Sequence, residues 1–307
     1  IGISIFIAFV WFVIIKKFSK IGALKKIFDK KIFFSKSAKS DYKVFLINQL
    51  VMMIISPLLI TQLTIATALY FYFHSIEWIS VGMFKDTLPI IIVTAFTIFQ
   101  FTIDDFSKYI IHRFMHKLPI LWSLHKVHHS ATVLTPMTVF RTHPLEGIIF
   151  SLRSSVTQAI SISLFVFLFA DSVNLITILG VNVFVFIFNI LGANLRHSHV
   201  GIRYWTWVEY IFISPGQHQL HHSIAKEHHD KNFGASLAIW DWLFGSLHHS
   251  VEFETLKLGL EKNPKEEAHS LFSLYLNPLI EIKNYTLNKL HKFTFLLKKK
   301  HLKENYK

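Results

Sequence analysis

Long apolar runs separated by short polar or basic stretches dominate the hydropathy pattern of this chain. A helix needs about 20 apolar residues to cross a bilayer. The pattern therefore predicts an all-α, polytopic integral membrane protein with about four to five transmembrane helices. The predicted spans are residues 2–15, 44–73, 88–103 (or on to Ile111), 147–169 and 173–193. The run 2–15 is short and lacks a cleavage-site pattern, so we interpret it as a truncated first span rather than a signal peptide.

Two of these runs contain helix-breaking residues. The run 44–73 carries Ser56-Pro57 in its middle, which predicts either one kinked span or a re-entrant pair, and we favour the kinked span. The runs 147–169 and 173–193 are separated only by Ala170-Asp171-Ser172. This short connection predicts a tight helical hairpin.

The distribution of lysine predicts the orientation in the membrane. Residues 16–43 carry ten Lys against two Asp, which places this segment in the cytoplasm by the positive-inside rule. Counting spans onward places residues 104–146 and everything after 194 on the same side. The expected location is a bacterial inner membrane, or the endoplasmic reticulum in a eukaryote. The tail 271–307 alternates apolar positions with eight Lys, which predicts an amphipathic helix on the inner leaflet, with a solvated basic tail as an equal alternative.

The amino-acid composition restricts the kinds of metal site, nucleophile and partner that the protein can have. The chain is 52% hydrophobic and contains no cysteine, which excludes disulfides, thiolate metal sites and a cysteine nucleophile. Its net charge of +13 comes from lysines beside apolar runs, so we expect anionic lipid and not nucleic acid as the partner. We divide the chain into an N-terminal membrane region (1–103), a catalytic region that includes the hairpin 147–193 (104–250) and a basic tail (251–307).

Eight histidines fall into three compact boxes. Helical positions three or four residues apart share a face, so each box directs its imidazoles toward one point. The boxes are His112-Arg-Phe-Met-His116, His125-Lys-Val-His128-His129 and His218-Gln-Leu-His221-His222. Imidazole suits iron, zinc and copper, so we interpret the boxes as a shared metal centre rather than as hydrogen-bonded core residues.

The number of histidines favours two metal ions. Eight ligands are too many for one four-coordinate ion and suit two ions that each keep an open position. Pro119 separates the first two boxes, and Ser214-Pro215-Gly216-Gln217 forms a capping-box pattern that predicts a helix start just before His218. The sequence thus predicts a cytoplasmic, histidine-rich cap that binds two metal ions.

Three further residues are candidates for this site. His143 and His197 are candidate additional ligands, with a structural role as the alternative. Asp105 lies two helical turns before His112, where its carboxylate could hold an imidazole N–H, or could simply favour the start of a helix. The remaining histidines in loop-like stretches are expected at the surface; they are His228, His229, His248 and His249.

Several ordered motifs resemble those of one known family. They are the three boxes, Phe140-Arg-Thr-His-Pro-Leu-Glu-Gly147, Asn232-Phe-Gly234 and Trp240-Asp-Trp-Leu-Phe-Gly245. Together they cover roughly residues 100–247 and resemble the fatty acid hydroxylase (sterol desaturase) superfamily of membrane non-haem di-iron oxygenases. Asp105-Phe-Ser-Lys-Tyr109 and LWSLHKVHHS resemble its alkylglycerol monooxygenase-like or bacterial sterol-desaturase-like branches.

The resemblance implies a function. It implies that the eight box histidines bind two Fe ions, and that O2 is the co-substrate for hydroxylation or desaturation of a lipid such as a fatty acyl chain, a sterol or an ether lipid. The chain shows no cysteine cluster or Rossmann glycine pattern, so electrons are expected from a donor in trans, a ferredoxin, a cytochrome b5 or a pterin. The rival hypotheses are a histidine-rich membrane metal transporter or metal-binding protein and a bis-histidine haem cytochrome.

Overall fold

The structure is a computed structural model that describes residues 2–59, 61–173, 195–250, 256–260 and 269–304. These ranges are mostly helical and contain no strand, only the isolated bridges Phe212–Leu237 and Ser223–Leu258. The predicted helical class is therefore confirmed for the part of the chain that the structure describes. The predicted span 173–193 lies almost entirely outside the described residues.

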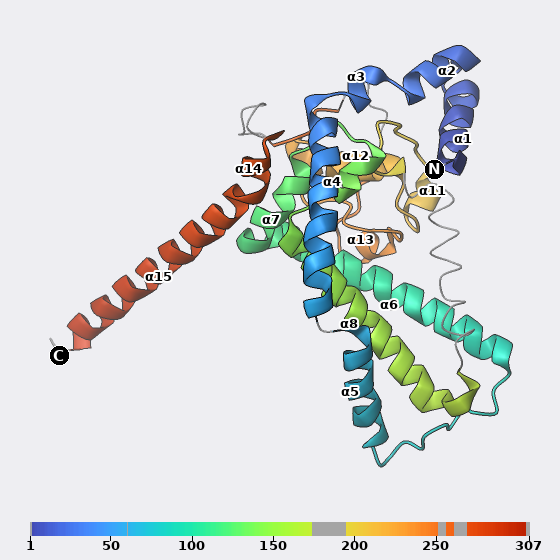
Figure 1. The fold of residues 1–307 in the computed structure, drawn as a ribbon, viewed down its shortest axis with the longest axis vertical. Coiled ribbons are helices and arrows are strands. Elements are labelled where there is room, and N and C mark those ends of the chain that lie inside the picture. Colours follow the sequence, from blue (N-terminus) through green and yellow to red (C-terminus); the bar gives the residue numbers. More distant parts are fainter. Residues whose placement is uncertain (1, 60, 174–194, 251–255, 261–268, 305–307) are drawn as a thin grey trace.

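Two long helices, α6 (Pro89–Lys117) and α8 (Pro144–Phe169), form the frame of the fold (Figure 1). Among the described helices, these two are long and apolar enough to cross a membrane. Each begins with proline at its first position, where the missing N–H is not needed for a helical hydrogen bond. The total number of spans and their orientation stay predictions.

Aromatic packing holds α6 and α8 together. Phe96 and Phe165 are buried, and their ring centroids lie 5.0 Å apart in an edge-to-face arrangement. Nearer the end of α6 that carries the first box, Arg153 of α8 donates to Asp104 of α6 at 2.8 Å. Apolar packing and one partly buried ion pair thus fix the two helices side by side.

The apolar run 44–73 is interrupted at Ser56-Pro57, where the sequence predicts a kink or a re-entrant turn. Helix α4 (Lys36–Ile55) ends at the short 3-10 helix η2 (Ser56–Leu58), and α5 (Gln62–His74) follows. Helix α5 continues beyond the end of α4 in Figure 1 and packs against α8. Neither α4 nor α5 alone meets the length and hydropathy expected of a span.

Short helices gather at the end of α6 and α8 where the boxes lie (Figure 1). They are α7 (Pro119–His129), η3 (Pro136–Phe140), α11 (Thr206–Glu209), α12 (Pro215–His221), η6 (Lys226–His228) and α13 (Ile239–Leu243). The other described elements are α1 (Gly2–Val10), the π-helix η1 (Trp11–Ile15), α2 (Lys20–Ile27), α3 (Lys30–Phe33), η4 (Ala170–Ser172), α14 (Leu271–Tyr275) and α15 (Asn277–Glu304).

Helix α15 leaves the bundle and ends far from it (Figure 1). Near its start, Glu281 pairs with Lys126 of α7. Further along, the apolar side chains Leu290, Phe293 and Phe295 are exposed between lysines. This arrangement suits the predicted amphipathic helix, whose place on a membrane surface stays a prediction.

Candidate metal centre

Each histidine box lies on a helix of its own. His112 and His116 occupy the last turns of α6, which extends beyond Ile111 to Lys117. Helix α7 begins at Pro119 and carries the second box. Before the third box, the Ser214 Oγ accepts a hydrogen bond from the Gln217 N–H at 3.0 Å, and Gln217 Oε1 accepts from the Ser214 N–H at 2.9 Å. The predicted capping box is thus confirmed, and it starts α12 just ahead of His218.

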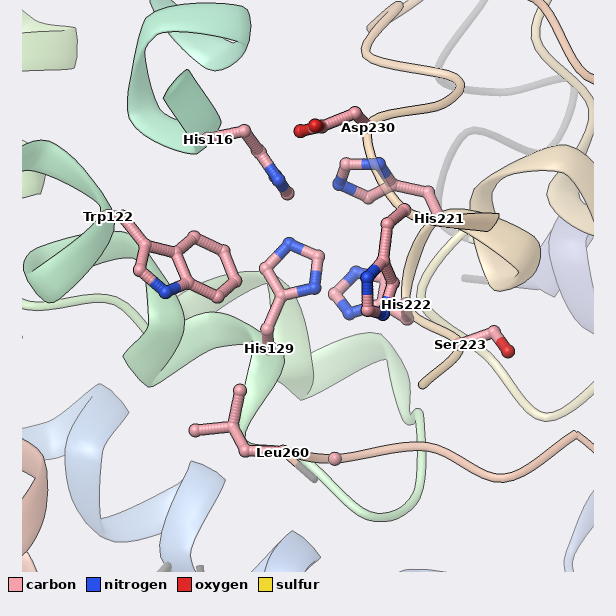
Figure 2. Close-up of a pocket in the computed structure, with 10 residues that line it drawn as sticks. His116, Trp122, His129, His221, His222, Ser223, Asp230 and Leu260 are labelled. Carbon is pink, nitrogen blue, oxygen red and sulfur yellow. The ribbon is translucent and has the colours of Figure 1, made fainter. Parts of the chain in front are cut away.

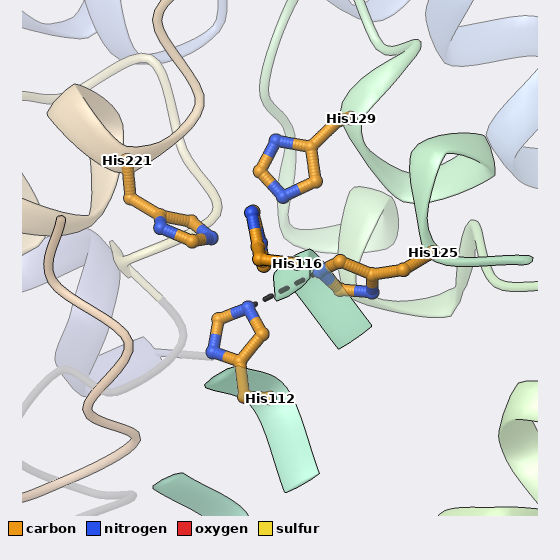
Figure 3. A group of neighbouring side chains, drawn as sticks. All are labelled: His112, His116, His125, His129 and His221. Atoms are coloured by element: carbon orange, nitrogen blue, oxygen red, sulfur yellow. Dashed lines mark hydrogen bonds between the residues drawn. The ribbon is translucent and has the colours of Figure 1, made fainter. Parts of the chain in front are cut away.

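The three boxes meet with their imidazoles facing one another (Figure 2, Figure 3). The rings form two groups, and within each group one nitrogen per ring lies within 4.8 Å of the others. The five-histidine cluster consists of His112, His116, His125, His129 and His221. The four-histidine cluster consists of His128, His197, His218 and His222. All eight box histidines and His197 are therefore brought together.

The spacing of ring nitrogens suits metal ions. The Nε2 atoms of His112 and His125 are 3.1 Å apart, and those of His197 and His218 are 2.8 Å apart. Nitrogen ligands bound at about 2.1 Å and at right angles to each other would lie about 3.0 Å apart. In addition, the buried Nε2 of His129 and that of His221 have no hydrogen-bond partner among the described residues. Converging, unpartnered nitrogens of this kind are an arrangement that a metal ion would satisfy.

Burial favours the neutral form of these imidazoles. Desolvation holds the pKa of His129 and of His222 well below the usual range, and neighbouring histidines lower each pKa further. Desolvation also lowers the pKa of His221 to about 3, although a hydrogen bond to the Lys231 carbonyl opposes this shift. Neutral imidazole is the form that binds metal.

Hydrogen bonds on the outer side orient the rings of the five-histidine cluster. His221 Nδ1 lies 2.7 Å from the Lys231 carbonyl, and His112 Nδ1 lies 2.7 Å from the Phe233 carbonyl. His125 Nδ1 lies 2.7 Å from Oε1 of Glu146, and both of these side chains are buried. An Nδ1–H donated outward leaves the Nε2 lone pair directed into the cluster.

Glu146 is a residue of the candidate site that the sequence analysis did not single out. It lies in the first turn of α8, where the helix dipole favours a negative charge, three residues after His143. In the sequence, the one indication of a role for this residue is a carboxylate at the start of an apolar helix. Only the packing of α8 against α7 shows that His125 is its partner.

Asp105 is buried but contacts no imidazole among the described residues. Its carboxylate accepts hydrogen bonds from the backbone N–H groups of Ser236 and Leu237, at 2.8 and 3.1 Å, and from the Trp240 indole at 2.9 Å. These contacts anchor the loop that follows Phe233, whose carbonyl orients His112. Asp105 thus contacts the loop that follows Phe233, and neither the imidazole contact nor the helix start considered for it is seen among the described residues.

The other histidines lie outside both clusters. His143 caps α8: its Nδ1 accepts from the Leu145 N–H at 3.2 Å, and its Nε2 lies 3.1 Å from the Tyr275 carbonyl. His228 was expected at the surface but is 6% exposed, because its ring packs against His248 at a centroid distance of 5.3 Å. The expectation for His228 was therefore wrong, whereas His229 is exposed as expected.

A cavity of about 320 Å³ lies against the clusters on the side of α6 and α8. Val139, Phe150, Phe233 and Ala235 give it an apolar wall. Lys108, Glu146 and Arg196 are the charged residues of its lining, next to the rings of both clusters. We call this space the apolar cavity.

Comparisons with known proteins point to one family. Residues 97–246 match the fatty acid hydroxylase family. The chain is 32% identical to an alkylglycerol monooxygenase of Danio rerio over 46% of this chain and 28% of that protein. It is 27% identical to an ornithine lipid hydroxylase of Rhizobium tropici over 52% of this chain and 43% of that protein.

A third relative is a Delta(7)-sterol 5(6)-desaturase of Aspergillus fumigatus, 28% identical over 51% of this chain and 49% of that protein. The chain thus spans less than half the length of each of these three relatives. No solved structure matches the chain.

The match to the fatty acid hydroxylase family includes all three boxes together with His143 and His197, and the predicted resemblance is confirmed. The chain therefore carries, in residues 97–246, a domain of the fatty acid hydroxylase family.

Proposed function

We propose that this protein is a membrane-bound, non-haem di-iron oxygenase that uses O2 and external electrons to hydroxylate or desaturate a lipid. The observation that carries this proposal is the position of the two histidine clusters, which lie beside an apolar cavity at one end of two membrane-length helices. The names of the relatives, a monooxygenase, a hydroxylase and a desaturase that act on lipids, support the same chemistry.

The donor set supports iron as the metal. Nine imidazoles in groups of five and four would leave open positions on two six-coordinate ions. The chain has no cysteine, so soft thiolate ligands are not part of the site. When bound, the two ions would supply the activation of O2 that an unactivated C–H bond requires.

The protein residues would position the substrate and exclude water. Phe150 and Val139 offer an apolar wall on which an acyl or sterol segment can pack beside His112 and His128. Exclusion of water limits side reactions near the reacting carbon. Glu146 would hold His125 in the tautomer that presents Nε2 to the metal.

A metal transporter is the rival function, and the position of the site argues against it. Transporters bind their ions near the bilayer midplane within broken helices. Here His112 and His116 occupy the last turns of an unbroken helix, and the other boxes lie on short helices beyond it. An ion in the clusters would therefore lie at the end of the membrane helices.

The direct test is oxygen incorporation. The full chain would be loaded anaerobically with Fe(II) and reduced by an added donor. It would then be supplied with ¹⁸O2 and candidate fatty acyl, ornithine, ether or sterol lipids. We expect a lipid product that carries one ¹⁸O atom, or one that has lost two hydrogens, which mass spectrometry would identify. Metal flux into sealed vesicles with no altered lipid would favour the transporter instead.

A further inference from the structure

The nine clustered imidazoles form a layer that lines two cavities. The apolar cavity is lined by His112, His125, His128, His197 and His218. A second cavity of about 190 Å³ is lined by His116, His129, His221 and His222 (Figure 2). No histidine of the clusters lines both cavities, and each one lines one of them. The metal centre can therefore be approached from two separate sides.

The second cavity differs chemically from the first. Beyond the four cluster histidines, its lining includes the polar residues Ser223, His229 and Asp230, together with Trp122, Gly259 and Leu260. Trp122 packs against the rings of the five-histidine cluster, at centroid distances of 5.1 Å from His116 and 5.5 Å from His129. We call this space the polar cavity.

The described surroundings of the polar cavity are basic. The described stretches that form it, 116–129, 221–231 and 256–260, carry more lysines than carboxylates. The lysines are Lys117, Lys126, Lys226, Lys231 and Lys257, and the carboxylates are Glu227 and Asp230. Two of the lysines are paired, Lys117 with Asp230 and Lys126 with Glu281 of α15. A negatively charged partner would be steered toward this face.

We propose that the two cavities have separate roles: the lipid occupies the apolar cavity, and an acidic one-electron carrier protein docks over the polar cavity. This inference rests on the proposed function. At about 190 Å³, the polar cavity is smaller than the roughly 300–1,000 Å³ of typical small-molecule sites, which favours a partner that docks across its mouth. Each transfer would oxidise the carrier by one electron and reduce one iron held by the clusters by one electron, so two transfers would supply the two electrons that the pair needs.

The separation would let both partners bind at once. The carrier meets the layer from the side of His116 and His129, and the lipid meets it from the side of His112 and His125. Electrons can then arrive from the polar cavity while the lipid excludes water from the apolar cavity. A shared entrance would force the two partners to bind in turn.

The absence of native cysteine allows a clean test with site-directed labels. His229→Cys places a thiol at the polar cavity, and Val139→Cys places one at the apolar cavity. Each variant would be loaded with iron, oxidised, and modified with the same bulky methanethiosulfonate reagent. Two quantities are measured without O2. The first is the rate of reduction by an acidic plant-type [2Fe–2S] ferredoxin, followed by stopped-flow absorbance. The second is the affinity for a fluorescent acyl lipid.

We expect the label at position 229 to remove most of the reduction rate and to leave lipid binding unchanged. The label at position 139 should have the opposite effects. Each unlabelled variant is the reference for its labelled form. Equal slowing by both labels, or slowing of reduction only by the label at position 139, would overturn the assignment of the cavities.

Charge reversal tests the choice of partner. Lys226→Glu, at an exposed position in the stretch 221–231 beside the polar cavity, should slow reduction by the ferredoxin about tenfold at low salt, with a smaller difference at high salt. Lys292→Glu makes the same charge change at an exposed position further along α15, which leaves the bundle, and should have little effect. Equal rates for both variants would refute an acidic protein partner. A chain that binds no iron would refute the proposed function itself, whereas an iron-loaded chain with unchanged reduction rates would refute only this inference.

Discussion

Glu146 accepts a hydrogen bond from Nδ1 of His125 at 2.7 Å, and both side chains are buried. The pair joins the first turn of α8 to the helix that carries the second box. It therefore fixes the tautomer of His125 and also its position relative to the apolar cavity. A carboxylate in this role usually strengthens the basicity of the imidazole it holds.

Replacement of Glu146 should weaken metal binding. Glu146→Leu removes the acceptor, and we expect a loss of about 10- to 100-fold in iron affinity. Glu146→Gln keeps an oxygen acceptor for the Nδ1–H and should lose much less. Iron competition against a chelator, measured on folded protein, gives both values. Equal affinities in the Leu and Gln variants would show that the hydrogen bond does not position His125.

Loss of a clustered histidine should remove metal and activity. We expect about two irons per chain after anaerobic loading, by the two-metal reasoning from the ligand count. His221→Ala should lower this content and abolish product formation, and the same holds for the other seven box histidines. His248→Ala is the matched control, because His248 contacts His228 and lies outside both clusters. Near-normal turnover of folded His221→Ala would refute a metal role for the third box.

Asp105→Asn should have an intermediate effect. An amide cannot accept all three hydrogen bonds from Ser236, Leu237 and Trp240 with the same geometry, so the loop that positions the Phe233 carbonyl should shift. We expect a loss of activity within the roughly 10- to 100-fold range of residues that act through a ligand. Product per folded protein is the measurement, with abundance as the normalising quantity. Activity as low as that of His112→Ala would instead indicate direct contact with the metal.

The buried pair Arg141–Asp41 should matter for stability. Arg141 NH1 lies 2.9 Å from Asp41 Oδ1, both side chains are fully buried, and Arg141 Nε donates to the Val127 carbonyl in α7. Asp41→Asn removes the negative charge that pairs with the buried guanidinium, which should cost about 3–5 kcal/mol in the free energy of unfolding.

An exposed ion pair provides the comparison. Lys117→Gln breaks the pair with Asp230, whose side chains are 47% and 43% exposed, and should cost about 0–1 kcal/mol. Thermal unfolding in one detergent would compare the two variants. A similar shift of both melting temperatures would show that the buried pair contributes no more than a surface pair.

The orientation in the membrane can be tested by single-cysteine labelling, which needs no background substitution in this chain. We expect Lys26→Cys and Lys299→Cys to face the cytoplasm with His125, and Glu77→Cys and Asp171→Cys to face the opposite side, by lysine asymmetry and span counting. An impermeant maleimide applied to sealed cells should label positions 77 and 171 only. Strong external labelling at position 26 would reverse the orientation.

The sequence by itself determined the local elements of the site. Box spacing places His112 and His116 on one helical face, Pro119 separates the first two boxes, and the Ser214–Gln217 capping box starts α12. These features depend on residues within a few positions of each other, where helix periodicity and capping chemistry decide the outcome. The apolar runs likewise indicated a helical membrane protein.

Only the tertiary structure decided how the boxes combine. His128 joins His197 and His218, while its neighbour His129 joins the five-histidine cluster. Successive positions on a helix point about 100° apart, so adjacent ligands serve different groups, and the angles between α6, α7 and α12 select which groups form. The contact between Glu146 and His125 was likewise decided by the tertiary structure. Contacts between residues far apart in sequence depend on helix packing, which local patterns do not specify.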